Sequence, residues 1–221
     1  MAKLAAIVGD TGSGKSSSIQ HLDPKTTYII NVAGKELPFK GSAKIYNREN
    51  KNYKEASTAE EVLEILQNVS EKGKNIKDII IEDGNYLMGF SLVNKATEVG
   101  YTKFSVMAQN MLKLIQGAKA LREDLNIYYF SHQEEIEDSG EIVNYKMKTA
   151  GKLIDSQIKL EGLFTVVLYA ITESKGDKTD YWFITNRYKK YPAKSPQSMF
   201  EDIKIPNNLK IVGDAVRAYY E

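Results

Sequence analysis

The sequence predicts an α/β fold in which a mostly parallel central sheet is flanked by helices. Two observations support this prediction. Short apolar runs alternate along the chain with segments of helical periodicity, which is the pattern of successive strand–helix units. The first apolar run, Leu4 to Val8, leads into a glycine-rich turn and then a helical segment. With 221 residues and 42% hydrophobic content, the chain can bury one core, so we expect a single domain over residues 1–221.

The turn after Val8 has the pattern G-x-x-x-x-G-K-S. It consists of Gly9, Asp10, Thr11, Gly12, Ser13, Gly14, Lys15 and Ser16, and Ser17 follows. Glycines here let backbone N–H groups converge on phosphates, while the lysine reaches the β- and γ-phosphates and the serine hydroxyl binds Mg²⁺. A helix predicted at Lys15 to Leu22 adds its dipole to the anion site. The turn therefore predicts a phosphate-binding loop for a nucleotide with Mg²⁺.

The next elements follow from the same patterns. We expect a strand at residues 26–32, a loop at 38–52, a helix that begins at Ser57–Thr58 and stops near Gly73, and a buried strand at 78–82. The helix start is predicted because the serine and the threonine each precede a glutamate by three residues, as in a capping box. The strand at 78–82 is continuously apolar before it ends in acids, which is typical of a buried parallel strand whose carboxyl end reaches the nucleotide.

The second half of the chain continues the alternation. We expect a helix at 104–122, a strand at 127–130, a hairpin at 134–145, a short helix at 149–160, strands at 165–171 and 181–185, and a closing helix at 214–220. Prolines at 192, 196 and 206 predict irregular backbone between the last strand and the last helix. The hairpin is an insertion that projects from the predicted sheet.

Three polar side chains are placed by these elements near the predicted phosphates. Asp83 follows the strand at 78–82, and we expect it to hold Mg²⁺ through water together with Ser16, with capping of the next turn as the alternative. Glu82 precedes it, and period-two alternation predicts that it lies on the opposite face, where it either polarises water or forms a salt bridge. His132 follows the strand at 127–130, a position from which it would sense the γ-phosphate; a structural histidine is the alternative.

Composition limits the remaining function classes. The formal net charge is +1, so no global charge favours a polyanion partner. The chain has no cysteine and two histidines, which excludes thiolate zinc sites and favours Mg²⁺ on oxygen ligands. No apolar run approaches the roughly 18 residues of a membrane-spanning helix, so we expect a cytoplasmic protein without membrane contact.

Several stretches spread over nearly the whole chain carry a family resemblance. They are residues 81–88, 100–104, 130–132, 151–155, 161–164, 193–196, 199–200 and 205–207. The sequence resembles the phage-encoded RecA-core ATPases, which include AAA-family proteins and some single-strand annealing or recombination proteins. The resemblance implies a RecA-like P-loop NTPase core that hydrolyses ATP with Mg²⁺, forms a ring or filament of identical subunits and acts on single-stranded DNA in the host cytoplasm. The chain departs from the group by having Glu82 before Asp83, and it has no clear counterpart of the accessory DNA-binding domains of full recombinases.

The resemblance also implies roles for individual residues. In a RecA-like arrangement, a carboxylate after the second strand orients the attacking water, and Glu36 occupies that position; an exposed surface glutamate is the alternative. Such ATPases generally complete their site with a basic residue from the neighbouring subunit. Arg187, which has several lysines near it, is the expected residue, and a solvated basic turn is the alternative. For single-stranded DNA, we expect contacts from Tyr145, Lys146, Lys148 and Lys152, because aromatic rings interleaved with lysines suit stacking and phosphate binding.

Two other functions share the phosphate loop. A small-molecule or nucleotide kinase would need an arginine-rich lid, and the four scattered arginines argue against it. A nucleotide-gated adaptor, such as a helicase loader or assembly partner, would hydrolyse slowly and signal by its binding state. The absence of an Asp-bearing guanine motif favours ATP over GTP.

Overall fold

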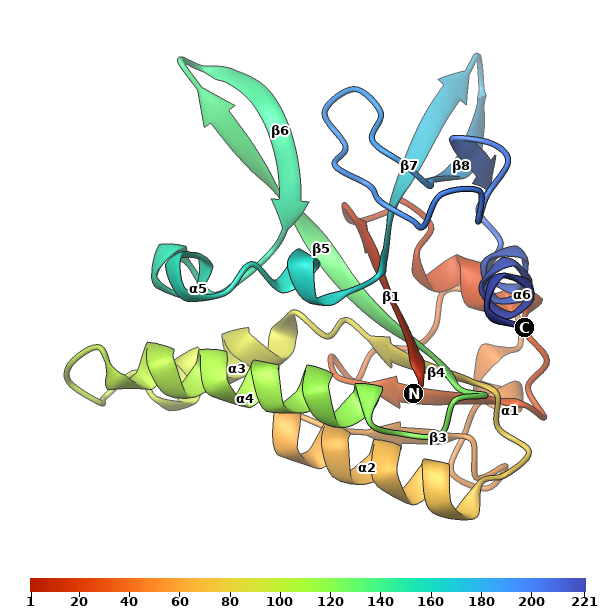
Figure 1. Cartoon of the computed structure of the whole chain (residues 1–221), viewed down its shortest axis with the longest axis horizontal. Helices are drawn as coiled ribbons and strands as arrows, with labels where there is room; N and C mark the ends of the chain where they lie inside the picture. The colour runs from red at the N-terminus through yellow and green to blue at the C-terminus, as the bar shows by residue number, and fades with distance from the viewer.

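The computed structural model describes residues 1–221, apart from the side chains of Lys152, Leu153 and Gln157. Nine strands form one sheet in the order β3-β2-β4-β5-β1-β7-β8-β9, and β6 pairs with β5 (Figure 1). The strands are β1 (Lys3–Gly9), β2 (Thr27–Asn31), β3 (Tyr53–Glu55), β4 (Asp78–Glu82), β5 (Asn126–Asp138), β6 (Glu141–Met147), β7 (Val166–Lys175), β8 (Lys178–Ile184) and β9 (Lys204–Pro206). Strands β1 to β5 and β7 are parallel, while β6 and β8 run antiparallel to their neighbours. The mostly parallel sheet with a hairpin insertion confirms the predicted fold class.

Helices cover both faces of the sheet. The α-helices are α1 (Ser42–Ile45), α2 (Ala59–Lys72), α3 (Tyr86–Asn94), α4 (Thr102–Lys119), α5 (Lys152–Gln157) and α6 (Leu209–Tyr220), and the 3-10 helices are η1 (Ser16–His21) and η2 (Leu160–Leu163). Figure 1 shows α2, α3 and α4 on one side and α6 with η1 on the other. None of the described helices is both long and apolar enough to cross a membrane.

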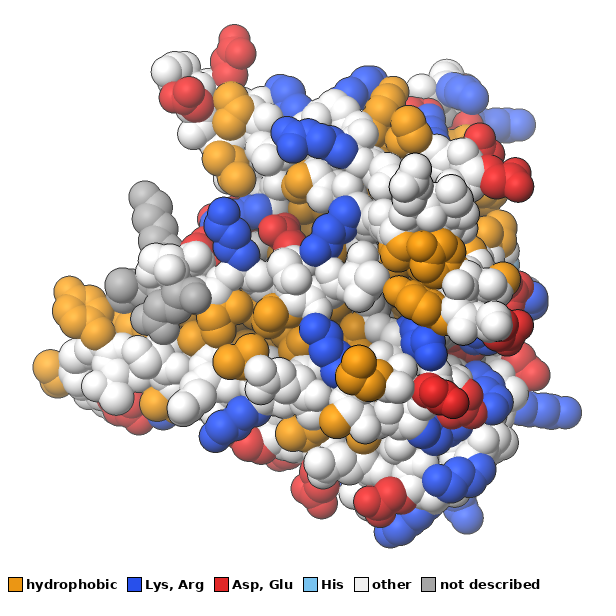
Figure 2. Space-filling view, viewed as in Figure 1, with side chains coloured by type: hydrophobic (Ala, Val, Ile, Leu, Met, Phe, Trp, Pro, Cys, Tyr) orange, Lys and Arg blue, Asp and Glu red, His pale blue; other side chains and the backbone are white. Residues whose placement is uncertain are grey.

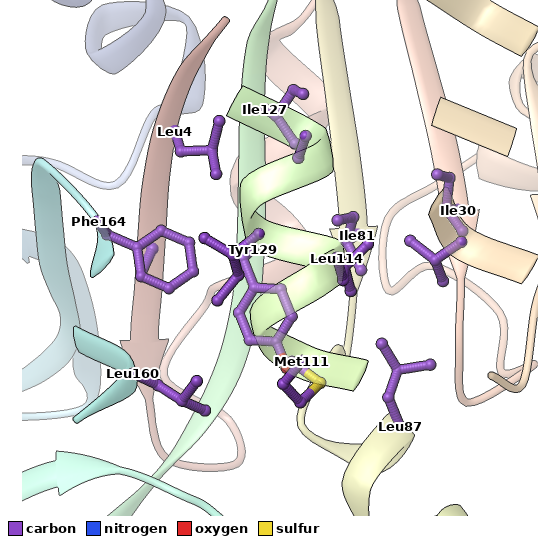
Figure 3. Packing of buried hydrophobic residues seen from close by; sticks show 14 of the residues in the cluster. Leu4, Ile30, Ile81, Leu87, Met111, Leu114, Ile127, Tyr129, Leu160 and Phe164 are labelled. Atoms are coloured by element: carbon purple, nitrogen blue, oxygen red, sulfur yellow. The ribbon is translucent and has the colours of Figure 1, made fainter. Parts of the chain in front are cut away.

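The larger of two hydrophobic clusters lies under α2, α3 and α4. Ile81 of β4 and Tyr129 of β5 meet Met111 and Leu114 of α4, and Phe164 closes the cluster beside β1 (Figure 3). Burial of each such side chain stabilises the fold by about 1.5–3 kcal/mol. This packing fixes the ends of β4 and β5, from which the polar side chains of the site project.

The other cluster lies on the opposite face. It contains Ile7 of β1, Phe130 of β5, Ile19 of η1 and Val212 of α6, all fully buried. It holds the segment after the phosphate loop against the sheet. The chain between β1 and β2 is therefore anchored on the core at Ile19, only a few residues beyond the loop.

The helix predicted from the capping box is confirmed. The Thr58 hydroxyl accepts a hydrogen bond from the Glu61 N–H at 3.2 Å, and the Glu61 carboxylate accepts one from the Thr58 N–H at 3.2 Å. Helix α2 then presents Val62 and Leu66 to the core and ends at Gly73. Reciprocal capping satisfies two N–H groups that would otherwise lack partners at the helix start.

The segment after the phosphate loop differs from the prediction. Residues 15–22 were expected to form one helix, but the structure has a short 3-10 helix at Ser16–His21. Three consecutive serines begin it, and the Ser18 hydroxyl donates to the Lys15 carbonyl at 2.6 Å. Serines compete for backbone groups in this way, which weakens an α-helix. Five further elements, α1, β3, α3, η2 and β9, were not predicted.

Candidate nucleotide-binding site

A cleft of about 330 Å³ lies where the parallel strands end. It is lined by residues 10–17, Lys35, Glu36, Pro38, Asp83, His132 and Tyr181. The sheet brings these segments together because Gly9 at the end of β1 pairs with His132 of β5 on one side and Ala170 of β7 on the other. Strand β5 separates β1 from β4, so His132 lies between the phosphate loop and the acids that end β4.

The loop backbone depends on its glycines. Gly12 and Gly14 have φ angles of 79° and 88°, a region that favours glycine. A Cβ atom at Gly9 would lie 2.6 Å from the Ser13 hydroxyl and 2.7 Å from the Ala170 carbonyl. The loop thus passes too close to β7 to allow a side chain at Gly9, and its positive φ angles at Gly12 and Gly14 require glycine at both positions.

Lys15 is folded into this loop. Its ammonium donates to the carbonyls of Gly9 at 2.7 Å and Asp10 at 2.9 Å, and the residue is only 5% exposed. Burial lowers the pKa of Lys15 to about 8, although Glu82 and Asp83 act in the opposite direction. The ammonium is therefore charged at neutral pH, and few water molecules can reach it. A buried positive charge of this kind forms strong hydrogen bonds with phosphate oxygens.

Glu82 is the acid that contacts the loop. The Ser16 hydroxyl donates to its Oε1, and the residue is 1% exposed. Its other oxygen, Oε2, is buried without a hydrogen-bond partner among the residues that the structure describes. Burial, together with the nearby Asp83, raises the pKa of Glu82 to about 7. A serine hydroxyl beside a buried carboxylate with a spare oxygen is a donor set that fits Mg²⁺.

This geometry corrects the prediction for the acidic pair. Glu82 was expected on the opposite face and Asp83 beside Ser16, but Glu82 makes the contact with Ser16. Strand β4 ends at Glu82, and Asp83 has a φ of 55°, in the left-handed region. Strand alternation therefore stops at Glu82, and the turn at Asp83 lets both carboxylates approach the phosphate loop.

Two side chains, Lys35 and His132, lie against the carboxylate of Asp83. Its Oδ2 lies 2.5 Å from the Lys35 ammonium, and its Oδ1 lies 3.6 Å from Nε2 of His132. Burial, followed by the charge of Lys15, lowers the pKa of His132, so its ring is neutral at pH 7. The backbone N–H of His132 donates to the side-chain oxygen of Asn85 at 3.0 Å. Asn85 thus holds the His132 backbone, while the His132 ring lies beside Asp83 in the cleft.

Three residues of the cleft, Lys35, Pro38 and Tyr181, were not predicted. Lys35 stands just before Glu36, whose exposed side chain lines the cleft, and a role for Glu36 in orienting water stays a prediction. Tyr181 of β8 packs its ring so closely on the phosphate loop that a Cβ at Gly14 would lie 2.7 Å from it. Lys35 follows an asparagine turn of Asn31 and Gly34 directly after β2, but no local pattern pairs it with Asp83. Tyr181 had no local signal.

Other predicted residues lie outside the cleft. Arg187 is exposed, does not line the cleft, and forms no ion pair among the described residues, so its action on a neighbouring subunit stays a prediction.

The four residues expected to contact DNA differ in their availability. Tyr145 stacks on Tyr191 with ring centroids 4.8 Å apart, and the Lys146 ammonium lies 2.5 Å from Asp155 and 3.5 Å from Glu134. Lys148 is exposed, and the side chain of Lys152 lies outside the described part of the chain.

The loop, the buried acid beside its serine, and the strand order define a class: the protein is a P-loop ATPase with a RecA-like fold. A family model described as an AAA domain matches residues 2–197, and the chain belongs to this family. Among solved structures, a KaiC-like protein from the hyperthermophilic archaeon Pyrococcus horikoshii matches with a TM-score of 0.54 at 10% identity, covering 92% of this chain and 84% of that one. No curated protein matches the sequence.

Proposed function

We propose that this protein is a phage-type RecA-like ATPase that uses Mg²⁺, assembles with copies of itself into a ring or filament, and acts on single-stranded DNA in recombination or annealing. The observation that supports the Mg²⁺-dependent chemistry is the contact of the Ser16 hydroxyl with the buried Glu82 beside the Lys15 loop. Glu82 and Ser16 would hold Mg²⁺, which neutralises negative charge on the phosphates when bound.

The chain's own groups account for the hydrolysis step. Lys15 and the loop N–H groups bind the phosphates and stabilise the charge that develops on them. A water oxygen bonds to the γ-phosphorus while the bond from that phosphorus to the bridging oxygen breaks, so ADP leaves with that oxygen. Asp83 accepts the proton that the water loses and passes it to the released phosphate. Neutral His132, beside Asp83, would orient the water or contact the γ-phosphate.

The proposed DNA surface depends on a few exposed side chains at the base of the β5–β6 hairpin and near the start of α4. The tip of the β5–β6 hairpin exposes acids (Glu135, Glu137, Asp138 and Glu141). Figure 2 shows red acidic side chains at the upper left, where Figure 1 draws this hairpin. These would repel a phosphate backbone. Exposed Lys148 lies at the base of the hairpin, where its N–H donates to the His132 carbonyl at 2.8 Å. Tyr101, which is 76% exposed near the start of α4, offers a ring for stacking.

The experiment that tests this function is the ATPase rate with and without single-stranded DNA, measured alongside mass by light scattering. We expect DNA to stimulate turnover of an oligomer. Lys148→Ala should reduce the slope of log affinity against log salt by roughly 0.7, the value of one phosphate contact on a single strand. Glu137→Gln, at the acidic tip, is the control that should not weaken binding. Turnover that DNA leaves unchanged would favour the nucleotide-gated adaptor instead.

A further inference from the structure

Lys35 is presented to the cleft by a turn that the Asn31 side chain holds. Asn31 is the last residue of β2 and is fully buried. Its side-chain oxygen accepts from the Gly34 N–H at 2.9 Å, and its amide nitrogen donates to the Lys35 carbonyl at 2.6 Å. Gly34 has a φ of 67°, which closes the turn. The backbone at Lys35 is therefore fixed relative to the sheet.

The side chain of Lys35 extends from this fixed backbone along the surface of the cleft. It is 52% exposed, whereas its partner Asp83 is 1% exposed. The two groups are 2.5 Å apart, and Lys35 lines the same cleft as Lys15 and Ser16. A long, half-exposed side chain can leave a partner and return without any backbone change.

The charges around Lys35 make an exchange of partners favourable when ATP binds. Lys35 is half exposed, so its ammonium loses little by moving from Asp83 to solvent or phosphate, and the buried Asp83 carboxylate keeps the charge of Lys15 nearby. A γ-phosphate beside Lys15 brings several negative oxygens into the cleft, and charge-assisted hydrogen bonds to phosphate are strong. While Lys35 stays on Asp83, its positive charge lies against that carboxylate oxygen and makes it a weaker base toward water.

We propose that Lys35 is a catalytic residue that acts in its own subunit: it leaves Asp83 for the γ-phosphate when ATP binds, which frees Asp83 for the attacking water. This inference rests on the proposed role of Asp83 in hydrolysis. ADP lacks the γ-phosphate, so in the ADP state Lys35 stays on Asp83. The ion pair then keeps Asp83 from accepting the proton of water until a triphosphate is bound.

The test compares Lys35→Ala and Lys35→Arg with Lys40→Ala, an exposed lysine in the same loop that does not line the cleft. The affinities for ADP and for ATPγS are measured by titration, and turnover is measured at saturating ATP. For Lys35→Ala we expect kcat to fall about 100-fold, in line with the loss of one preorganised charge contact. We also expect about 10-fold weaker ATPγS binding, with ADP binding unchanged within about twofold. Lys35→Arg should keep most of the ATPγS affinity, and Lys40→Ala should match the wild type.

An equal loss of affinity for ADP and ATPγS would overturn the proposal, because it is the result expected of a counter-ion that only stabilises buried Asp83. Unchanged kcat would also overturn it. Lys35→Gln, which keeps a polar side chain, serves if Lys35→Ala does not fold. The two affinities do not depend on DNA or on hydrolysis, so they still decide the matter if the proposed role of Asp83 fails.

Mixing separates action within a subunit from action across an interface. Lys35→Ala and Lys15→Ala damage the same site if Lys35 acts in its own subunit. We then expect no recovery of turnover in assemblies shown by mass to contain both variants. Recovered turnover would place Lys35 on a neighbour's phosphate and overturn the proposal.

Discussion

Replacing Glu82 with glutamine is expected to change how the stability of the nucleotide-free protein depends on pH. Burial raises the pKa of Glu82 from the ordinary value of 4.5 to about 7. Between these values the folded protein binds the proton more tightly than the unfolded chain does. The contribution of Glu82 to stability is therefore fully present below pH 4.5 and is lost as the pH rises to 7.

The size of the effect follows from the pKa shift. Each pKa unit corresponds to 1.36 kcal/mol, so a shift from 4.5 to about 7 costs the wild type about 3 kcal/mol across this range. Glutamine does not titrate, and its buried NH₂ group carries a cost of about 1–3 kcal/mol at every pH. The unfolding free energy of Glu82→Gln minus that of the wild type should thus rise by about 3 kcal/mol between pH 4 and 7.5, whatever its starting value.

The assay is urea unfolding at several pH values, with nucleotide removed and a chelator present. Glu64→Gln is the matched control, because Glu64 is exposed in the middle of α2. Its difference from the wild type should stay flat over the same range. Parallel pH profiles for Glu82→Gln and the wild type would refute the reasoning, since they would mean that the carboxyl is not desolvated in the folded protein.

Further predictions concern the cleft and its surroundings. Lys15→Ala should abolish turnover, because the ammonium that binds the phosphates is lost. The protein should stay folded, because the substitution removes a buried charge. Circular dichroism checks the fold, and an ATPase assay checks the turnover. Asp83→Asn should lower kcat by about 100-fold or more with nucleotide binding retained; unchanged turnover would remove Asp83 from the reaction. Gly84→Ala should destabilise the fold by about 1–3 kcal/mol in urea, since the new Cβ would overlap the Tyr129 ring. If Arg187 serves a neighbouring subunit, mixtures of Arg187→Ala with Lys15→Ala should regain turnover, and mixtures that stay inactive would exclude that role.

The phosphate loop and most of the sheet could be predicted because their signals are local. The glycine spacing after Val8 requires one backbone conformation, and the apolar run before Glu82 is continuous. The capping box at Thr58 likewise depends on residues three positions apart. Such features are encoded within a few residues of where they act.

The features that sequence reasoning missed depend on single dihedral angles or on distant partners. Alternation predicts the faces of strand residues only while the backbone stays extended, and Asp83 leaves that conformation. Lys35 acquires its role from a carboxylate 48 positions away, which no local pattern indicates. Lys146 carries the aromatic–lysine pattern of a nucleic-acid contact, yet Asp155 neutralises it. Strand β3 has only three residues with two exposed charges, and its pairing with β2 defines it.

Strand β5 connects the nucleotide site directly with the tip of the β5–β6 hairpin. Its 13 residues run without interruption from the core, past His132 in the cleft, to Asp138 at the hairpin tip. At about 3.3 Å per residue, the arm from His132 to the tip is about 20 Å long. A tilt of about 10° at the cleft would move the tip by roughly 3–4 Å over that arm. The chain shifts register between Ile136 and Glu137, so the outer end bends most easily there. A shift of His132 in the cleft would therefore be carried along β5 toward the hairpin tip, with the bulge between Ile136 and Glu137 as the point where the strand departs from a straight course.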